Sequence, residues 1–142
     1  MPYILDTDHL SLLQKEGDGS RTLLARISKV PPDDMATTIV TFQEEVLGWL
    51  SELNRGKKAD QIVRCYKRLD RVRLNFERMN VLPFDEAAQI VYGPLRRQCS
   101  TVGTLDLRIA SIALVTGSIL LTRNFRDFKQ VPGLRFEDWT ES

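Results

Sequence analysis

The sequence predicts an α/β fold, a parallel sheet of four to five strands with helices on both faces. Short apolar runs alternate along the chain with longer segments of helical periodicity, which is the pattern of strands joined by helical crossovers. One late helix is apolar all round, and the strand after it is a continuous apolar run, so both are expected to be buried on two sides. A chain of 142 residues has the size of one domain, and we expect a single domain over residues 1–142.

Four strands are expected, and each is a short apolar run bounded by polar or turn-forming residues. The first ends at Asp6, and the last follows Gly117, which is predicted to end the apolar helix. After the last strand, the tail is expected to be irregular. The predicted strands are residues 3–5, 35–39, 81–83 and 118–122.

Helices are expected in each gap between these strands. In the first gap, helical spacing breaks at residues 16–20 and resumes until a pair of prolines. In the second gap, an amphipathic helix starts at Thr41, and a long charged helix occupies residues 57–78.

The third gap holds a helix over residues 85–99 and then the apolar helix, which Thr104 is expected to cap. Gly93 and Pro94 should bend or interrupt the first of these, because proline lacks an amide donor and clashes with the preceding turn.

The composition excludes several classes of function. The net charge is only +1, so no overall basicity marks a nucleic-acid binder. The single histidine, His9, excludes zinc sites that need two histidines, and Cys65 and Cys99 are too few for a four-thiolate site. Neither a run of 18 apolar residues nor a signal-peptide pattern occurs, so we expect a cytoplasmic protein with reduced thiols and no membrane partner.

Four carboxylates are predicted at the carboxyl edge of the sheet, where ligands bind in open α/β folds. One follows the first strand, one lies near the start of the helix after the second strand, one near the start of the apolar helix, and one follows the fourth strand: Asp6, Glu44, Asp106 and Asp127. Converging carboxylates repel one another unless they share a cation, and an all-oxygen set without His or Cys selects Mg²⁺ or Mn²⁺. The predicted chemistry is metal-assisted hydrolysis of a phosphodiester.

Three of these acids also have a structural interpretation. Asp6, or Asp8 beside it, could cap the first helix. Asp106 suits the positive end of a helix dipole, although an unpaired carboxylate is costly on so apolar a helix. Asp127 lies among basic residues, so a surface ion pair is an equal alternative.

Glu44 has the strongest structural alternative, because Thr41 and Glu44 have the spacing of a capping box. Against this, Gly48 lies one turn further along the same helix face and leaves bare space beside the carboxylate. The neighbouring Glu45 is a competing candidate, but the spacing to Gly48 favours Glu44.

Four segments, taken in order, carry a family resemblance. They read YILDTD, TIVTFQEEVLG, LDLRIA and LTRNFRDF at residues 3–8, 38–48, 105–110 and 121–128, and the ending VPGL with EDW adds to them. Together they resemble the PIN-domain ribonucleases and, more narrowly, the VapC-type toxins of bacterial toxin–antitoxin pairs. The resemblance spans nearly the whole chain. It implies a PIN-like domain, a metal-dependent endoribonuclease activity on RNA, a homodimer, and a cognate antitoxin that covers the cleft.

The resemblance also implies roles for particular residues. Asp6, Glu44 and Asp106 match the acids of the family's site, with Asp6 and Asp106 as metal ligands. Where many members have a further aspartate, this chain has Asn124. Asp127, three residues later, is expected to compensate, with Asp8 as another candidate.

Basic residues concentrate between Arg55 and Arg78, where nine basic and three acidic side chains give a local charge of +6 and leave −5 for the rest of the chain. Such a helix can follow phosphates electrostatically, but a solvated face or a dock for an acidic partner explains it equally well. Arg123 and Arg126, with Asn124, lie nearer the predicted cleft. The arginines are expected to hold the scissile phosphate through their planar, bidentate geometry.

Two other functions stay open. The run Asp6-Thr7-Asp8 after an apolar strand also resembles the aspartate-nucleophile phosphatases of the haloacid dehalogenase type, with Asp6 as nucleophile and Asp8 as general acid–base. Leu10 departs from that motif, and no suitable lysine precedes the late acids. A module that binds RNA or a protein partner without catalysis is the third hypothesis.

Overall fold

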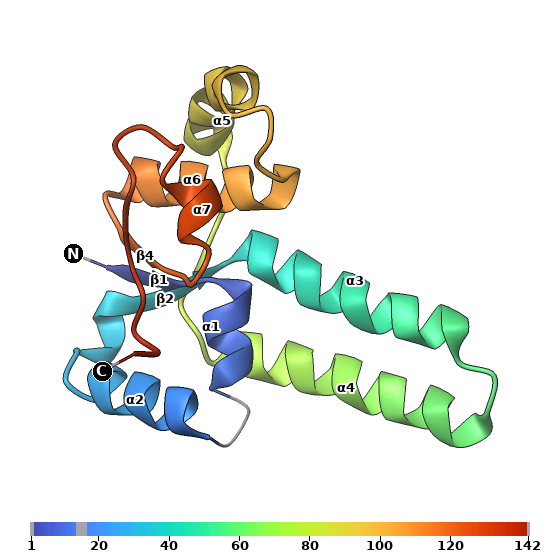
Figure 1. Cartoon of the computed structure of the whole chain (residues 1–142). Helices are drawn as coiled ribbons and strands as arrows, with labels where there is room; N and C mark the ends of the chain where they lie inside the picture. Colours follow the sequence, from blue (N-terminus) through green and yellow to red (C-terminus); the bar gives the residue numbers. More distant parts are fainter. Residues whose placement is uncertain (1, 14–16, 142) are drawn as a thin grey trace.

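Five parallel strands form one sheet in the order β3-β2-β1-β4-β5 in the computed structural model, which describes residues 2–13 and 17–141 (Figure 1). The prediction of a parallel α/β sheet of four to five strands is confirmed. Residue 16, in the predicted break, lies outside the described part of the chain. The strands are β1 (Tyr3–Leu5), β2 (Met35–Thr38), β3 (Val81–Leu82), β4 (Ile119–Leu121) and β5 (Arg135–Glu137).

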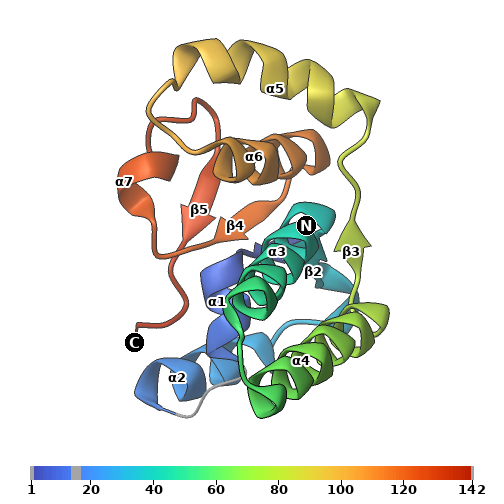
Figure 2. The same ribbon diagram turned by 90° about the vertical axis from the view of Figure 1, so that its right-hand side faces the viewer.

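Helices cover both faces of this sheet. In Figures 1 and 2, α5 and α6 lie over one face, and α1 to α4 lie on the other side. The helices are α1 (Thr7–Leu12), α2 (Asp18–Ile27), α3 (Ile39–Arg55), α4 (Ala59–Glu77), α5 (Glu86–Gln98), α6 (Thr104–Thr116) and α7 (Phe125–Phe128), with a 3₁₀ turn at Pro32–Asp34.

Two apolar cores, one on each face, hold the layers together. Successive residues of a strand point to opposite faces. Ile4 and Leu120 therefore pack in the core formed with α5 and α6, whereas Leu5 and Leu121 pack in the core formed with α1 to α4. All four side chains are at most 3% exposed, so the central strands β1 and β4 are buried on both faces, as their unbroken apolar sequences predict.

Helices α3 and α4 run side by side as an arm that extends away from the sheet (Figure 1). Several large apolar side chains remain exposed on this arm, including Leu47, Val63 and Tyr66. The basic segment found in the sequence makes up α4 and its flanks.

The start of α3 differs from the prediction. Strand β2 ends at Thr38 rather than residue 39, and the Thr38 hydroxyl accepts a hydrogen bond of 3.1 Å from the backbone N–H of Thr41. Thr38 is therefore the N-cap. The alternative interpretation of Glu44, a capping box with Thr41, is wrong, because Thr41 already lies inside the helix and Glu44 is left for another contact.

Three smaller expectations were also wrong. The expected interruption of α5 does not occur, since the helix continues through Gly93 and Pro94; the carbonyl deprived of its donor belongs to Ile90, a residue 74% exposed to solvent. Gly103, not Thr104, is the N-cap of α6. The tail is not irregular, since it contains α7 and β5, and β5 extends the sheet beside β4.

Gly117 ends α6 as expected. Its φ of +65° places it in the left-handed region, which glycine adopts without a steric penalty.

No helix within residues 2–13 and 17–141 is both long enough and apolar enough to cross a membrane. The cytoplasmic location stays a prediction, as does the assignment of residues 1–142 to a single domain.

Candidate active site

The candidate site lies where β1 and β4 pair at the centre of the sheet. From β1 the chain winds outward through β2 and β3, then returns to β4 on the other side of β1. This reversal of strand order opens a crevice at the carboxyl ends of the two strands, the usual binding place in open α/β sheets. Asp6 directly follows β1, and Arg123 and Asn124 follow β4, so both sides of the crevice carry polar residues.

Asp6 is buried, with 8% exposure, and is the N-cap of α1. Its Oδ1 accepts a hydrogen bond of 2.8 Å from the backbone N–H of His9. Asp8 does not cap the helix. It lies in the first turn, where its carboxylate is 3.9 Å from Nη1 of Arg123 across the crevice.

Glu44 reaches the same crevice from α3. Its Oε1 accepts a hydrogen bond of 2.7 Å from the hydroxyl of Thr7, the residue after Asp6. Since Thr38 performs the capping of α3, Glu44 is available to be held next to the end of β1.

Asp106 lies in the first turn of α6 and is half-buried. The pKa of Asp106 is raised to about 6, first by burial and then, in decreasing order, by the negative charges of Glu44, Asp6 and Asp127. The other three acids that the sequence singled out are therefore close enough for their charges to act on Asp106. The four acids come from four separate segments of the chain.

Asn124 and Asp127 form a reciprocal pair at α7. The Asn124 amide donates a hydrogen bond of 3.0 Å to Oδ2 of Asp127, and Oδ1 of Asn124 accepts one of 3.4 Å from the backbone N–H of Asp127. Asn124 is thus the N-cap of α7 and holds Asp127 in place. The surface ion pair expected as an alternative is loose, with Arg126 Nε 3.7 Å from the carboxylate.

Gly48 has open space where a Cβ would stand. It lines a groove of about 540 Å³ between α1, α3 and α4, together with Thr7, Trp49 and Glu45. Glu44 is not part of that lining, so the bare space at Gly48 lies beside Glu45. Burial, and then the charge of Glu44, raise the pKa of Glu45. The observation that favours Glu44 is its effect on Asp106, which Glu45 does not share.

The basic residues lie on two sides of the site. Arg123 and Arg126 carry exposed side chains near the crevice. On the arm, the Arg68 guanidinium lies 5.7 Å from the Trp49 ring centroid, and Arg68 and Arg71 line the groove at Gly48.

Sequence reasoning missed the contacts that Thr7 and His9 make. Thr7 bonds to a residue 37 positions away, and His9 to one 130 positions away. The signal that could have indicated these contacts is that both residues are polar and lie in the helix directly after a buried strand.

In the part of the chain that the structure describes, no three His, Cys, Asp or Glu side chains are already arranged to hold a metal ion. The donor set nevertheless fits a hard divalent cation, since it consists of carboxylate and amide oxygens. The mutual repulsion that raises the pKa of Asp106 is also what a bound cation would relieve.

The sheet order and the acid cluster at its centre define a class of protein. The sequence model of the PIN domain family matches residues 3–134, and the chain belongs to that family. Within it, the chain is 30% identical over 146 residues to Ribonuclease VapC1 of Haemophilus influenzae strain R2866, covering 99% of this chain and 100% of that protein.

Solved structures agree with this placement. The structure of VapBC-1 from nontypeable Haemophilus influenzae matches with a TM-score of 0.77 and 26% identity, covering 99% of this chain and 100% of that one. A member of the VapBC family of toxin–antitoxin systems, VapBC-5 from Mycobacterium tuberculosis, matches with a TM-score of 0.59 and 25% identity over 96% of each chain. These matches favour the ribonuclease resemblance over the alternative of an aspartate-nucleophile phosphatase.

Proposed function

We propose that this protein is a VapC-type toxin, an endoribonuclease that hydrolyses RNA phosphodiester bonds with Mg²⁺ or Mn²⁺. The observation that carries the proposal is the convergence of Asp6, Glu44, Asp106 and Asp127. Burial of Asp106 and the negative charges of the other three acids together raise its pKa to about 6. This acid cluster belongs to a PIN-domain chain that is similar over nearly its whole length to a ribonuclease.

Asp6 and Asp106 are the proposed metal ligands, and Glu44 and Asp127 complete the acidic site. When bound, the cation would polarise the phosphodiester and lower the pKa of a water molecule. Thr7 fixes the direction of the Glu44 carboxylate, and Asn124 fixes that of Asp127. Asp6 has one oxygen committed to the His9 N–H and the other available.

Arg123 and Arg126 are proposed to hold the phosphate of the RNA, with Asn124 beside them. Arg123 follows β4 and Arg126 lies in α7, and both carry exposed side chains on the β4 side of the crevice, opposite Asp6. The arginine–carboxylate pair of Arg123 and Asp8 is long, and exposed pairs of this kind are weak, so a phosphate can replace Asp8 at little cost.

The proposal is tested by RNA cleavage with purified protein and Mn²⁺ or Mg²⁺, with and without a chelator. Asp6→Asn should keep the helix cap, because Asn caps as well as Asp, yet lower cleavage by roughly 100-fold or more, the upper range for perturbing a metal site. Asp106→Asn should behave alike. Asp85→Asn is the matched control, since Asp85 is the N-cap of α5 and lies outside the acid cluster.

Full cleavage activity of Asp6→Asn and Asp106→Asn, or cleavage that continues in the presence of the chelator, would contradict the proposal. RNA affinity without cleavage, unaffected by the chelator, would instead favour the non-catalytic binding module.

A cognate antitoxin and a homodimer are also proposed. The antitoxin is supported by the similarity to a VapBC toxin–antitoxin structure, and the exposed apolar residues of the arm offer a surface that a partner chain could cover. Expression of the chain alone should arrest growth, co-expression of the small neighbouring protein should relieve it, and Asp6→Asn should relieve it without that protein. Light scattering of the purified chain tests the dimer.

A further inference from the structure

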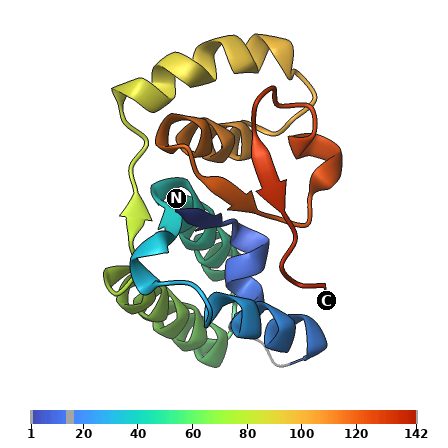
Figure 3. The same cartoon turned by 90° about the vertical axis from the view of Figure 1, so that its left-hand side faces the viewer.

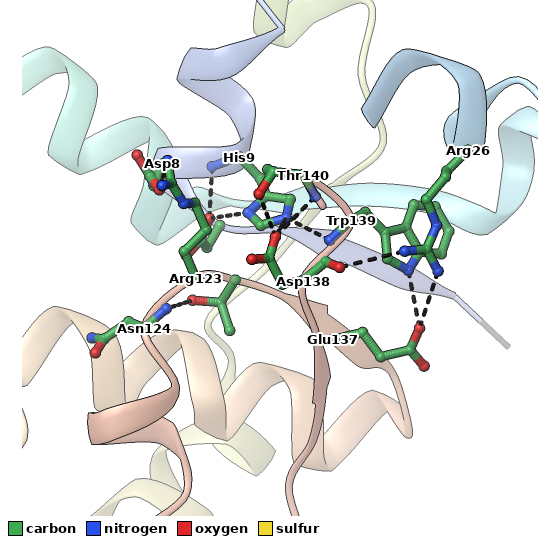
Figure 4. Close-up of polar contacts among 11 residues, drawn as sticks. Asp8, His9, Arg26, Arg123, Asn124, Glu137, Asp138, Trp139 and Thr140 are labelled. Atoms are coloured by element: carbon green, nitrogen blue, oxygen red, sulfur yellow. Dashed lines mark hydrogen bonds and ion pairs between the residues drawn. The ribbon is translucent and has the colours of Figure 1, made fainter. Parts of the chain in front are cut away.

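His9, the single histidine of the chain, is fully buried in α1 and lies next to Asp138, Trp139 and Thr140 of the C-terminal segment (Figure 4). Its Nε2 accepts a hydrogen bond of 3.2 Å from the backbone N–H of Trp139. Its Nδ1 lies 3.4 Å from Oδ1 of Asp6. In the described ranges, Nδ1 is the one buried side-chain nitrogen or oxygen that has no hydrogen-bond partner.

The segment that holds His9 is itself fixed. After β5 the chain passes α1 and ends near α2 (Figures 1 and 3). The Trp139 ring is 4% exposed, lies 4.6 Å from the Tyr3 ring, and has the Arg26 guanidinium 4.8 Å from its centroid. The backbone N–H of Trp139 therefore has little freedom to move away from the imidazole.

This contact decides where the imidazole carries its hydrogen. A nitrogen that accepts a hydrogen bond has no hydrogen of its own, so Nε2 is bare and the hydrogen of a neutral ring is on Nδ1. The rival arrangement would have an Nε2–H donating to Oδ1 of Asp138, 3.5 Å away. That oxygen already accepts bonds of 2.8 and 2.6 Å from the N–H and hydroxyl of Thr140, which favours the first arrangement.

We propose that His9 is a positioning residue that couples the C-terminal segment to Asp6, with its Nε2 held by the Trp139 N–H and its Nδ1–H directed at Oδ1 of Asp6. The backbone N–H of His9 bonds to the same oxygen at 2.8 Å. Together, this N–H and the imidazole hold Oδ1 toward helix α1. Oδ2 of Asp6 is then the oxygen left for a cation. Groups that orient a metal-binding carboxylate in this way change metal affinity without touching the metal.

The coupling to a metal rests on the proposed function, but the orientation of His9 can be measured without metal or RNA. Because the chain has one histidine, tag-free protein labelled with ¹⁵N-histidine gives the signals of a single imidazole. In metal-free protein, we expect the hydrogen on Nδ1 and a bare Nε2. A hydrogen on Nε2, donated to Asp138, would overturn the proposal.

Two substitutions separate the two ends of the ring. In His9→Gln, the longer side chain can still accept the Trp139 N–H but offers no donor at the Nδ1 position. In His9→Asn, the shorter amide stands near the Nδ1 position but does not reach Trp139. Both keep a polar, uncharged side chain in the same buried place.

Direct Mn²⁺ titration, followed by electron paramagnetic resonance without RNA, measures the effect. We expect His9→Gln to weaken Mn²⁺ binding about tenfold, at the lower end of what losing such an orienting group costs. His9→Asn should bind Mn²⁺ within about threefold of the wild type. Amide exchange at Trp139 should instead speed up in His9→Asn and stay slow in His9→Gln.

Equal Mn²⁺ affinity of the wild type and a folded His9→Gln, with weak binding by Asp6→Asn, would overturn this inference and leave the proposed function standing. Absence of Mn²⁺ binding by the wild type itself would overturn the proposed function and, with it, the coupling of His9 to a metal.

Discussion

Thr7 and Glu44 are joined by a hydrogen bond of 2.7 Å from the threonine hydroxyl to Oε1 of the glutamate. The bond links the residue after Asp6 to the first turns of α3, so the end of β1 sets the direction of an acid that belongs to another strand–helix unit. It can form because Thr38, six residues earlier, provides the cap of α3 and leaves the Glu44 side chain uncommitted.

Loss of this hydroxyl should impair the site more than the fold. Thr7→Val keeps the shape of the side chain but cannot donate, so the Glu44 carboxylate loses its anchor. We expect metal-dependent RNA cleavage to fall about tenfold, the lower end for losing an orienting hydrogen bond. Thr7→Ser is the matched control, and it should retain most of the activity. Equal rates for the Val and Ser variants, measured under single-turnover conditions, would show that the bond does not matter.

Asp106 should make the stability of the metal-free protein depend on pH. Its pKa rises from 3.8 to about 6 in the folded chain, so the folded state binds this proton more tightly than the unfolded state. The resulting stability is fully present below about pH 4 and is lost as the pH rises through 6. The raised pKa of Glu45 acts in the same direction.

After a discount for the partial exposure of the carboxyl, the Asp106 effect is roughly 1–2 kcal/mol, or about 3–6 °C in Tm for a chain of this size. Thermal unfolding in EDTA should therefore give a higher Tm near pH 5 than near pH 7. The difference should shrink in Asp106→Asn and upon addition of Mn²⁺. A Tm that is higher at pH 7 in the wild type and unchanged in the variant would contradict this account.

The sequence was sufficient for the parts of the fold that depend on local patterns. The apolar runs ending at Asp6 and Thr122 had to be buried strands, and parallel strands bring their carboxyl ends to one edge. Local patterns alone therefore place the four acids together at that edge of the sheet.

The remaining features depend on contacts between distant segments. Thr38 and Thr41 are both sound N-cap residues, and only the pairing of β2 with its neighbours decides that Thr38 is the cap. Strand β5 has one partly buried apolar residue, Phe136, which is too weak a pattern to mark a strand. The burial of His9 follows from the path of the tail, not from its own sequence.

Glu44 and Glu45 should differ in their effect on Asp106. Glu44→Gln removes the charge that has the largest effect on the pKa of Asp106. That pKa should therefore fall toward its ordinary value in a carboxyl titration by NMR. Glu45→Gln should leave the pKa of Asp106 nearly unchanged. Cleavage should likewise be lowered more by Glu44→Gln, and a larger loss in Glu45→Gln would give the role to Glu45 and to the groove at Gly48.

Asn124 should be needed for stability at α7 and for the direction of Asp127. Asn124→Ala removes an N-cap, so unfolding in urea should show a loss of about 1 kcal/mol. Asn124→Asp is the informative partner. It keeps an oxygen to accept the Asp127 N–H but replaces the donated bond to Asp127 with repulsion between two carboxylates.

We therefore expect Asn124→Asp to be destabilised in EDTA by a similar ~1 kcal/mol and to regain stability when Mn²⁺ is added, because a cation offsets the repulsion. Asn124→Ala should show no greater gain from Mn²⁺ than the wild type. If Mn²⁺ stabilises both variants to the same extent, residue 124 lies too far from the cation for its charge to matter. Asp127 would then be the residue of this segment that acts on the cation.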